Sequence, residues 1–396
     1  MRILTFSSLY PNPRQASHGI FVENRLRKLL EYAPQIEVRV VAPVPWFPSS
    51  NPRFGSYAQY AGVPTREQRH GIDVQHPKYP VIPKIGMRLT PHLMYRAVRA
   101  AFARVRAEGF DFDLIDAHYF YPDGVAAMWL ARAFDRPFVV TGRGTDLNLV
   151  PQYPGPRRRI LEVADSAAHM MTVAGALKDY LTGMGVAGER VTVLRNGVDL
   201  EFFHPTDERQ ALRAELGFGE RPTLLSVGHL IERKGHHLAI EAMAALPDMS
   251  LVIAGDGVEE GALKAQVESL GLQARVHFAG RLGQEDLRRH YQAADALVLA
   301  SSREGWANVL LESMACGTPV VATPVDGTPE VVAAPAAGQL TADRSAAAIA
   351  SAARALFADL PLRTATRAYA EGFSWDDTSQ GQLDIFQDAI ARHRSA

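Results

Sequence analysis

The stretch LIDAHYFYPDGVAAMWLARAFDRPFVVT, residues 114–141, places two short apolar runs on either side of a longer apolar segment. Residues 114–117 and 138–141 have the length of strands, and residues 124–134 have the length of a helix. A strand, a helix and a strand in this order predict a βαβ unit. Its two strands must be parallel, because the connection crosses over the sheet.

The same alternation runs along most of the chain. Further strands are predicted at residues 3–6, 38–42, 170–173, 223–227, 250–254, 275–279, 296–300 and 318–322. This pattern predicts an α/β protein with doubly wound parallel sheets, covered by helices on both faces. The alternation pauses at residues 194–205, so we expect two domains. Residues 43–84, rich in Pro, Tyr and Arg, are too long for an ordinary connection and are expected to form a functional or lid-like excursion.

Composition excludes several classes of protein. The chain has 396 residues, of which 47% are apolar and 21% charged, which is typical of a globular protein and not of a disordered or fibrous one. The net charge of −1 provides no global field to hold nucleic acid. The single cysteine, Cys316, and an N-terminus without the layout of a signal peptide lead us to expect a cytoplasmic protein. No apolar run reaches the roughly 18 residues that span a bilayer.

One amphipathic segment could rest on a membrane surface. An apolar stripe faces one side of the predicted helix, and basic residues face another; the stripe consists of Leu93, Met94, Ala97, Val98, Ala101, Phe102 and Val105. The simpler interpretation is a helix packed on the sheet. Arg96, Arg99 and Arg106, together with residues 157–159 (RRR), could instead give peripheral contact with anionic lipid at the inner face of the membrane.

Glycines, bases and acids follow the predicted strands at the edge where open α/β sheets bind ligands. In the first half these residues are Gly19, His118, Arg143 and Asp146, and in the second half Gly228, Arg233, Lys234, Gly257 and Glu304. Two sheet edges of this kind predict a cleft lined from both sides. His118 could equally be a structural histidine, and Asp146 could cap the turn that follows it.

Arg233 and Lys234 stand side by side where a helix is expected to begin. Cations there oppose the positive end of the helix dipole, and a bound diphosphate would compensate them. The alternative is an ordinary solvated helix start.

Glu304 and Glu312 are separated by seven residues, with the first in a loop and the second inside a predicted helix. The amides near residues 306–309 would point toward an anion, and the two carboxylates could accept hydrogen bonds from hydroxyls on either side of it. Alternatively, Glu312 only complements the helix dipole.

Three segments resemble one known family. SVGHLIERKG (226–235), AGDG (254–257) and EGWANVLLESMACGTPVVA (304–322) are similar to motifs of the retaining glycosyltransferases of family 4, and NGVD (196–199) is similar to their linker. The resemblance covers nearly the whole chain and is most specific over residues 223–332. It implies the GT-B fold, with two doubly wound Rossmann-like domains facing each other across a cleft. Residues 1–200 would form the acceptor domain, onto which a C-terminal helix at about 374–396 crosses back, and residues 201–373 the nucleotide-sugar domain.

The resemblance also implies roles for particular residues. The catalytic residues would be His118, Arg233, Lys234 and Glu304. The nucleotide sugar would be held by Gly19, Gly228, Arg233, Lys234, Gly257, Glu304, Gly305, Trp306, Ala307, Asn308, Val309 and Glu312, with Glu312 on the ribose. Arg143 and Asp146 are acceptor-side candidates. The chain departs from the family where Arg143-Gly144 replaces His-Gly, His18-Gly19 replaces paired glycines, and Trp306 replaces Phe.

The implied reaction moves a hexose from a nucleoside-diphosphate sugar, a UDP- or GDP-sugar, to an acceptor hydroxyl with retained configuration. Arg233 and Lys234 would stabilise the departing diphosphate without a metal, and no cofactor is expected. The acceptor would be a glycan or lipid-linked glycan, as in the assembly of bacterial exopolysaccharide or another surface glycan.

Three other functions are alternatives for a sequence of this kind. A GT-B nucleotide-sugar epimerase would act without an acceptor, and a non-catalytic sugar-binding protein would normally carry a signal peptide. A nicotinamide oxidoreductase fails on spacing, because the glycine after Gly257 is Gly261, one position late for the dinucleotide fingerprint.

Overall fold

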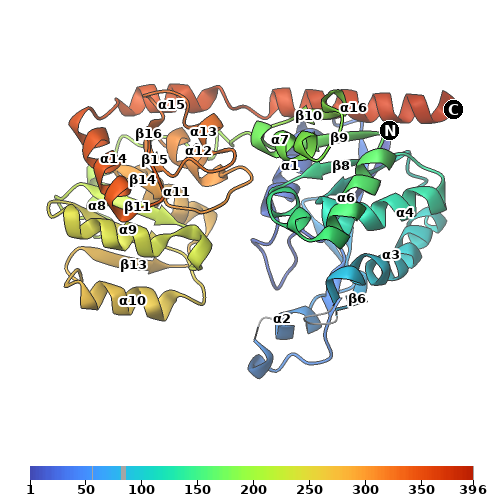
Figure 1. Cartoon of the computed structure of the whole chain (residues 1–396), viewed down its shortest axis with the longest axis horizontal. Helices are drawn as coiled ribbons and strands as arrows, with labels where there is room; N and C mark the ends of the chain where they lie inside the picture. The colour runs from blue at the N-terminus through green and yellow to red at the C-terminus, as the bar shows by residue number, and fades with distance from the viewer. Residues whose placement is uncertain (56, 82–85, 396) are drawn as a thin grey trace. The chain divides into compact units, whose positions relative to one another are not determined.

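The computed structural model describes residues 1–55, 57–81 and 86–395 (Figure 1). It divides into two compact units. Unit 1 comprises Met1–Arg195 and Trp375–Ala396, and unit 2 comprises Asn196–Ser374. Each has its own sheet and its own hydrophobic core.

Unit 1 is built on an eight-stranded sheet with the order β10-β9-β8-β7-β1-β2-β5-β4. Neighbouring strands are parallel except β4 and β5, and Ile3 pairs with Val38 on one side and Leu114 on the other. The strands are β1 Arg2–Phe6, β2 Glu37–Val41, β4 Arg66–Arg69, β5 Ile72–Gln75, β7 Leu114–His118, β8 Phe138–Gly142, β9 His169–Thr172 and β10 Val191–Val193. The predicted βαβ unit is therefore confirmed as β7, α4 and β8.

Helices cover both faces of this sheet. On one face, Leu29 of α1 and Phe386 of α16 pack with Ile3 in a fully buried core. On the other face, Phe102 of α3 meets the ring of Phe6 at 5.9 Å between centroids. The helices of unit 1 are α1 Ile20–Tyr32, α2 Tyr57–Ala61, α3 Thr90–Ala107, α4 Val125–Phe134, α5 Thr145–Asn148, α6 Pro154–Ser166, α7 Gly175–Gly183 and α16 Asp376–Ser395.

The amphipathic segment forms α3 and packs on the sheet, as the simpler interpretation predicted. Met94, Val98 and Phe102 are fully buried, whereas Arg96 and Arg99 are exposed. Among the described residues, no helix is both long enough and apolar enough to cross a bilayer.

The expectation of a lid-like excursion at residues 43–84 is wrong for its second half. Residues Arg66–Arg69 and Ile72–Gln75 form a hairpin that extends the main sheet, because β5 pairs in parallel with β2. His70 and Gly71 have positive φ angles of 49° and 79°, and they form the tight turn that joins the two strands. Short strands β3 (Val44–Trp46) and β6 (Lys78–Pro80) pair separately. Residues 56 and 82–84 of this segment lie outside the described residues.

Unit 2 is a six-stranded parallel sheet with the order β13-β12-β11-β14-β15-β16. The strands are β11 Thr223–Val227, β12 Ser250–Ala254, β13 Val276–Gly280, β14 Ala296–Leu299, β15 Val320–Ala322 and β16 Gly338–Leu340. The five strands predicted after residue 222 are thus confirmed to within a few residues.

Helices α9, α10 and α14 bury one face of this sheet around Ile240, Leu263 and Ile349. The helices of unit 2 are α8 Arg209–Glu215, α9 His236–Ala242, α10 Glu260–Ser269, α11 Gln284–Ala293, α12 Asn308–Ala315, α13 Thr328–Val331, α14 Ala346–Ala358 and α15 Arg363–Glu371. Each unit is therefore a doubly wound α/β sandwich, as predicted.

Candidate functional site

Arg233 and Lys234 lie in a 3-10 turn, Glu232–Lys234, that follows β11. The expected helix start is displaced, since α9 begins only at His236. Gly235 ends the turn with φ +72°, and a Cβ there would lie 2.0 Å from the carbonyl oxygen of Ala300. Only glycine allows the turn to press so closely against the end of β14.

The carboxylate of Glu304 meets both cations. Its Oε1 lies 2.5 Å from Lys234 Nζ and 3.5 Å from Arg233 Nη1, and it accepts a hydrogen bond of 2.6 Å from Ser301 Oγ. Burial acts to raise the pKa of Glu304, but Lys234 and Arg233 outweigh it and the pKa is lowered. The carboxylate is therefore ionised and partly neutralises the two cations.

Backbone contacts join the two loops that carry these residues. Arg233 Nη1 donates to the carbonyl of Arg303 at 2.7 Å, and Ser302 N donates to the carbonyl of Arg233 at 2.8 Å. Glu304 N donates to Asp326 at 2.9 Å. Residues 70 positions apart in sequence are thus held in one cluster.

Among the described residues, Glu312, unlike Glu304, contacts a tyrosine hydroxyl and no cation. It lies in α12 beyond the first turn, so the interpretation as a helix-start acid is wrong. Tyr291 of α11, which the sequence reading missed, donates its hydroxyl to Glu312 Oε2 at 3.0 Å. Burial raises the pKa of Glu312 to about 7, although the bond from Tyr291 lowers it. Nothing in the local pattern distinguishes Tyr291 from an ordinary core aromatic residue.

Trp306 fixes the loop between the two glutamates. Only 7% of it is exposed, and its Nε1 donates to the carbonyl of Asn196 at 3.0 Å. Asn196 Nδ2 in turn donates to Asn308 at 3.3 Å. Gly305 lies in the loop, Ala307 precedes the first residue of α12, and Val309 lies in its first turn.

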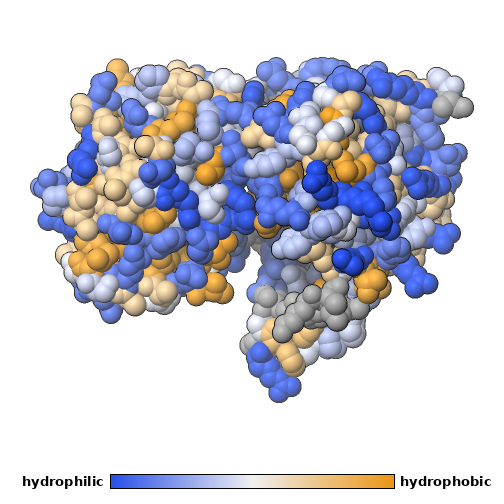
Figure 2. Space-filling view, in the orientation of Figure 1, coloured by the Kyte–Doolittle hydropathy of each residue, from blue (hydrophilic) through white to orange (hydrophobic). Residues whose placement is uncertain are grey.

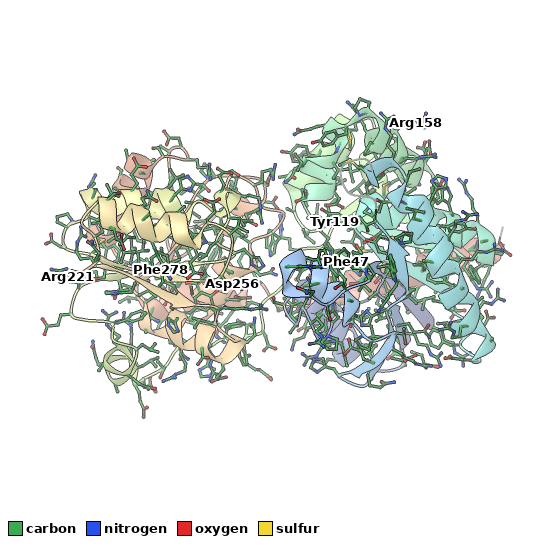
Figure 3. All side chains as sticks on the ribbon, turned by 90° about the horizontal axis from the view of Figure 1, so that it is seen from below. Phe47, Tyr119, Arg158, Arg221, Asp256 and Phe278 are labelled. Atoms are coloured by element: carbon green, nitrogen blue, oxygen red, sulfur yellow. The ribbon has the colours of Figure 1, made fainter. Side chains whose placement is uncertain are left out.

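Gly228 and Gly257 allow close packing around the cluster. The Lys234 side chain lies 3.4 Å from the place where a Cβ on Gly228 would be. A Cβ on Gly257 would lie 2.4 Å from the carbonyl oxygen of Leu230. The loops after β11 and β12 therefore pack against each other; Figure 3 labels Asp256 in the second of them.

In unit 1, His118 ends β7 and is 1% exposed. Its Nε2 lies 3.1 Å from Asp116 Oδ2, and its Nδ1 lies 2.5 Å from Arg143 Nη2. A guanidinium only donates, so Nδ1 is assigned as the acceptor and Nε2–H as the donor to Asp116. Burial lowers the pKa of His118 to about 4, which Asp116 opposes and Arg143 supports. The imidazole is therefore neutral at pH 7, and both nitrogens are engaged.

Arg143 lies at the end of β8, buried, with its guanidinium 5.5 Å from the ring centre of Phe21. Burial and Arg25 of α1 hold its pKa well below the usual range. Asp116 was not predicted as a site residue. It lies two residues before His118 in the same strand, so the two side chains share one face of the sheet, and this spacing was a usable signal in the sequence. Arg25 had none.

Asp146 accepts backbone N–H bonds from Phe120 at 2.8 Å, Arg143 at 3.0 Å and Gly144 at 2.9 Å. The expectation that it caps the following turn is wrong, because its carboxylate accepts instead from the backbone before α5, at Arg143 and Gly144, and from Phe120 after β7.

Gly19 precedes α1 with φ +65°, and a Cβ there would lie 2.2 Å from the carbonyl carbon of Leu9. The first loop of unit 1 is therefore closely packed at this glycine.

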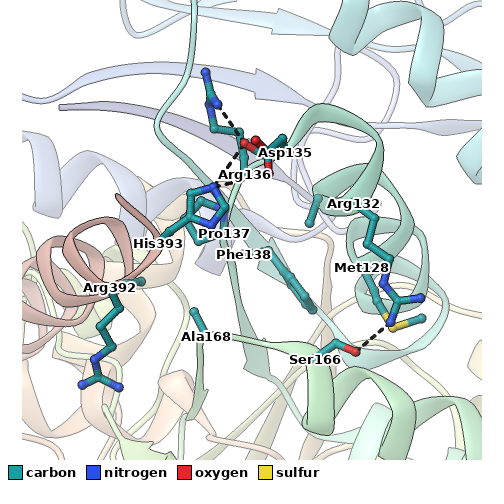
Figure 4. Close-up of a pocket in the computed structure, with 12 residues that line it drawn as sticks. Met128, Arg132, Asp135, Arg136, Pro137, Phe138, Ser166, Ala168, Arg392 and His393 are labelled. Carbon is teal, nitrogen blue, oxygen red and sulfur yellow. Dashed lines mark hydrogen bonds and ion pairs between the residues drawn. The ribbon is translucent and has the colours of Figure 1, made fainter. Parts of the chain in front are cut away.

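Two further observations bear on the chemistry. Within the described ranges, no group of three or more His, Cys, Asp or Glu side chains could hold a metal ion. A cavity of about 420 Å³ lies at the amino end of β8, beside Pro137 and Phe138, where Arg132 bonds Ser166 (Figure 4). It is at the opposite end of the strand from Arg143, so it is separate from the His118 cluster.

The chain is similar to known proteins. The family described as Glycosyltransferase Family 4 matches residues 22–202, and the family described as Glycosyl transferases group 1 matches residues 208–373. A D-inositol 3-phosphate glycosyltransferase from Catenulispora acidiphila is 33% identical over 313 residues, which are 72% of this chain and 74% of that protein. A protein described as a teichuronic acid biosynthesis glycosyltransferase, TuaC of Bacillus subtilis, is 28% identical over 83% of this chain and 82% of its own length.

Solved structures show the same fold. The sucrose-phosphate synthase of Thermosynechococcus elongatus gives a TM-score of 0.80 at 21% identity, over 99% of this chain and 100% of that one. HepE of Anabaena in complex with UDP gives 0.74 at 21% identity, over 97% and 99% of the two chains, and HepE has also been solved with UDP-glucose.

Proposed function

This chain belongs to the family 4 glycosyltransferases, which have the GT-B fold, and on that premise we propose that it transfers a hexose from a nucleoside-diphosphate sugar to an acceptor hydroxyl with retention of configuration. Unit 2 would bind the donor and unit 1 the acceptor. The observation that carries the proposal is the cluster of Arg233, Lys234 and Glu304 after β11 and β14.

Arg233 and Lys234 would stabilise the leaving diphosphate. Negative charge grows on that group as the glycosidic bond breaks, so two fixed cations favour the transition state over the ground state. Glu304 already holds both side chains in place, which reduces the reorganisation that binding requires. Two cations can supply the charge that a divalent metal supplies elsewhere, so we propose a metal-independent reaction without a cofactor.

The two glutamates would hold hydroxyl groups. Glu304 is ionised and would accept bonds from the donor sugar, and Glu312 would accept bonds from the ribose. Glu312 must lose its proton to accept two such bonds, so donor binding would be linked to the pKa near 7.

His118 would orient substrate and would not transfer a proton. Its two ring nitrogens are engaged by Asp116 and Arg143. We propose instead a front-face reaction, in which the bond from the anomeric carbon to the diphosphate breaks and a bond to the acceptor oxygen forms on the same face. The acceptor proton passes to the departing phosphate oxygen, so the products are the glycoside and the nucleoside diphosphate.

The known relatives favour particular substrates. HepE binds UDP and UDP-glucose, which supports a UDP-sugar donor over a GDP-sugar. The relationship to TuaC supports a role in bacterial surface-glycan or exopolysaccharide assembly, with a glycan or lipid-linked glycan as acceptor.

The exposed arginines of α3, including Arg96 and Arg99, favour peripheral contact with the inner face of an anionic membrane. Co-sedimentation with anionic vesicles at low salt, abolished at high salt, tests this contact. Failure to co-sediment at low salt would exclude it.

Product analysis tests the function. Purified protein is incubated with UDP-glucose, with and without a panel of glycan acceptors, and products are analysed by NMR. We expect UDP release that depends on the acceptor and a glycosidic bond with the α configuration of the donor. Conversion of the donor sugar without any acceptor would show an epimerase, and a β-linked product would exclude retention.

A further inference from the structure

A second group of cations in unit 1 has no role in the function proposed above. Arg88, Arg158 and Arg159 line a cavity of about 340 Å³ together with Tyr121 and the first turn of α6. Strongly hydrophilic side chains gather over this helix in the space-filling view (Figure 2), and Arg158 projects outward from the surface in Figure 3. All residues that line the cavity belong to unit 1, and one of them, Tyr121, comes three residues after His118 in the chain.

The first turn of α6 is electrostatically unbalanced. Its sequence is PGPRRR, with no acidic residue, so three cations oppose the positive end of the helix dipole. No side chain of a described residue caps the helix, and Gly155 carries the single N–H among the first three residues because the others are prolines. An anion in the cavity would compensate both the dipole and the cations.

Two of the cations that line the cavity pack against neighbouring residues. The Arg159 guanidinium lies 5.6 Å from the ring centre of Trp129, and its Nη1 donates to Glu162 at 2.6 Å. Arg88 lies against the helix start, where its Nε would be 3.5 Å from a Cβ on Gly155.

Among the described residues, fewer acids than arginines pair at the cavity. Glu162 also pairs with Arg158, at 3.6 Å, so one carboxylate serves two of the three arginines. The Arg88 side chain has no hydrogen bond or ion pair to any described residue. Tyr121 lines the same cavity; burial raises the pKa of its phenol, and the positive charges of Arg159 and Arg88 lower it. Tyr121 itself donates to the carbonyl of Met87.

We propose that this cavity binds a phosphate group, with Arg88 and Arg158 as the principal ligands. Arginine forks match phosphate oxygens in pairs, and the uncapped turn adds one N–H donor. We assign this phosphate group to the acceptor molecule, and this assignment rests on the proposed function. It could come from a soluble sugar or polyol phosphate, or from a lipid phosphate. The side chains of Met87 and Leu89, 45% and 50% exposed, flank Arg88 and could contact the acyl chains of a lipid.

Calorimetric titration without any donor tests the proposal, so that its outcome is independent of sugar transfer. The probes are glycerol 3-phosphate and monomeric dihexanoyl phosphatidic acid, which carry the same phosphate without and with acyl chains. The test variant is Arg88→Ala/Arg158→Ala. The matched control is Arg392→Ala/Arg394→Ala, which removes two arginines of α16 whose side chains are 70% and 69% exposed, against 72% for Arg158. A Lys234→Ala variant reports binding in unit 2.

We expect the test variant to weaken binding of at least one probe about tenfold or more. The control and Lys234→Ala should remain within about twofold of the unchanged protein. If the unchanged protein binds both probes with similar affinity and the test variant binds neither, the ligand is a soluble phosphate. Tighter binding of the lipid, removed by Met87→Ser/Leu89→Ser, assigns a lipid phosphate. Unchanged binding in the test variant would overturn the proposal. So would an equal loss of binding in the control variant, or a loss of binding that occurs only in Lys234→Ala.

Discussion

At the scale of single residues, the two charged clusters behave in opposite ways. In unit 2, Glu304 stays ionised because Lys234 and Arg233 lie beside it. In unit 1, His118 stays neutral because it is buried and its Nδ1 faces a second cation, Arg143. The first arrangement is suited to binding an anion, and the second is suited to holding a ring in a fixed orientation.

Lys234 should be essential for transfer. Lys234→Ala removes a cation from the departing diphosphate, so we expect kcat to fall by about a hundredfold or more with little change in melting temperature. Initial rates of UDP release measure the effect. Lys264→Ala is the control, because Lys264 is an exposed lysine paired with Glu260 on α10. Near-normal turnover in Lys234→Ala would remove Lys234 from the mechanism.

Arg143 should control the protonation of His118. In Arg143→Met the nearby positive charge is lost while Asp116 remains, so the pKa of His118 should rise from about 4 by at least about one unit. NMR titration of the ring measures it. Arg25, Asp116 and Arg143 are the charged groups that act on the imidazole, so Arg99→Met on the exposed face of α3 is a suitable control.

The same substitution should change the acid sensitivity of the fold. The folded pKa of His118 is below the unfolded value of about 6.5, so the unfolded state binds more protons between about pH 4 and 6.5. His118 therefore lowers the free energy of unfolding as pH falls through this window, and less so in Arg143→Met. An unchanged NMR titration in the variant would show that Arg143 does not act on the ring.

Donor binding should depend on pH through Glu312. The free carboxyl has a pKa of about 7, and ribose hydroxyls favour its ionised form, so a proton is released on binding. The affinity for UDP-glucose should rise from about pH 6 through pH 7 and level off above about pH 8. Calorimetry at several pH values measures it, and Glu312→Gln should give a flat profile. A flat profile in the unchanged protein would contradict the assignment.

At the scale of elements, α16 is part of the core of unit 1. Phe386 is fully buried with Leu29 and Ile3, and Arg25 of α1 donates to Gln382 at 2.8 Å and to the carbonyl of Leu194 at 2.9 Å. The C-terminal helix therefore stabilises the sheet that carries His118.

Removing the Phe386 ring should destabilise unit 1. Phe386→Ala leaves a cavity in the core, and we expect a loss of about 3–5 kcal/mol in the free energy of unfolding. Urea denaturation measures it, with Asp388→Ala on the exposed side of α16 as the control. A loss below about 1 kcal/mol would show that α16 is not part of this core.

The sequence predicted the buried parallel strands better than it predicted the polar hairpin and the turns between elements. Buried parallel strands such as β7 and β11 are continuous apolar runs, which are visible in a window of a few residues. The hairpin of β4 and β5 was missed because REQR and IDVQ contain many polar side chains, and their pairing depends on β2, far away in sequence. The 3-10 turn before α9 was predicted as a helix start because the positive φ of Gly235 and its close contact with Ala300 have no local signal in the sequence.

At the scale of the whole molecule, the motifs identified the family, and the geometry added what no motif contains. Arg233, Lys234 and Glu304 were predicted to bind a ligand, but the ion pair between them depends on the packing of β11 beside β14. Arg143, one partner of His118, and Tyr291, the partner of Glu312, likewise come from other elements. Long-range contacts of this kind have no local signal in a single sequence.

The central claim is that unit 2 binds a nucleoside-diphosphate sugar through its cation pair. The most direct measurement is the melting temperature of the purified protein with UDP-, GDP- and ADP-linked sugars, because a ligand bound only by the folded state must raise it. We predict a concentration-dependent rise with UDP-sugars, smaller with the others and lost in Lys234→Ala. No rise with any of these donors, or an equal rise in Lys234→Ala, would contradict the account.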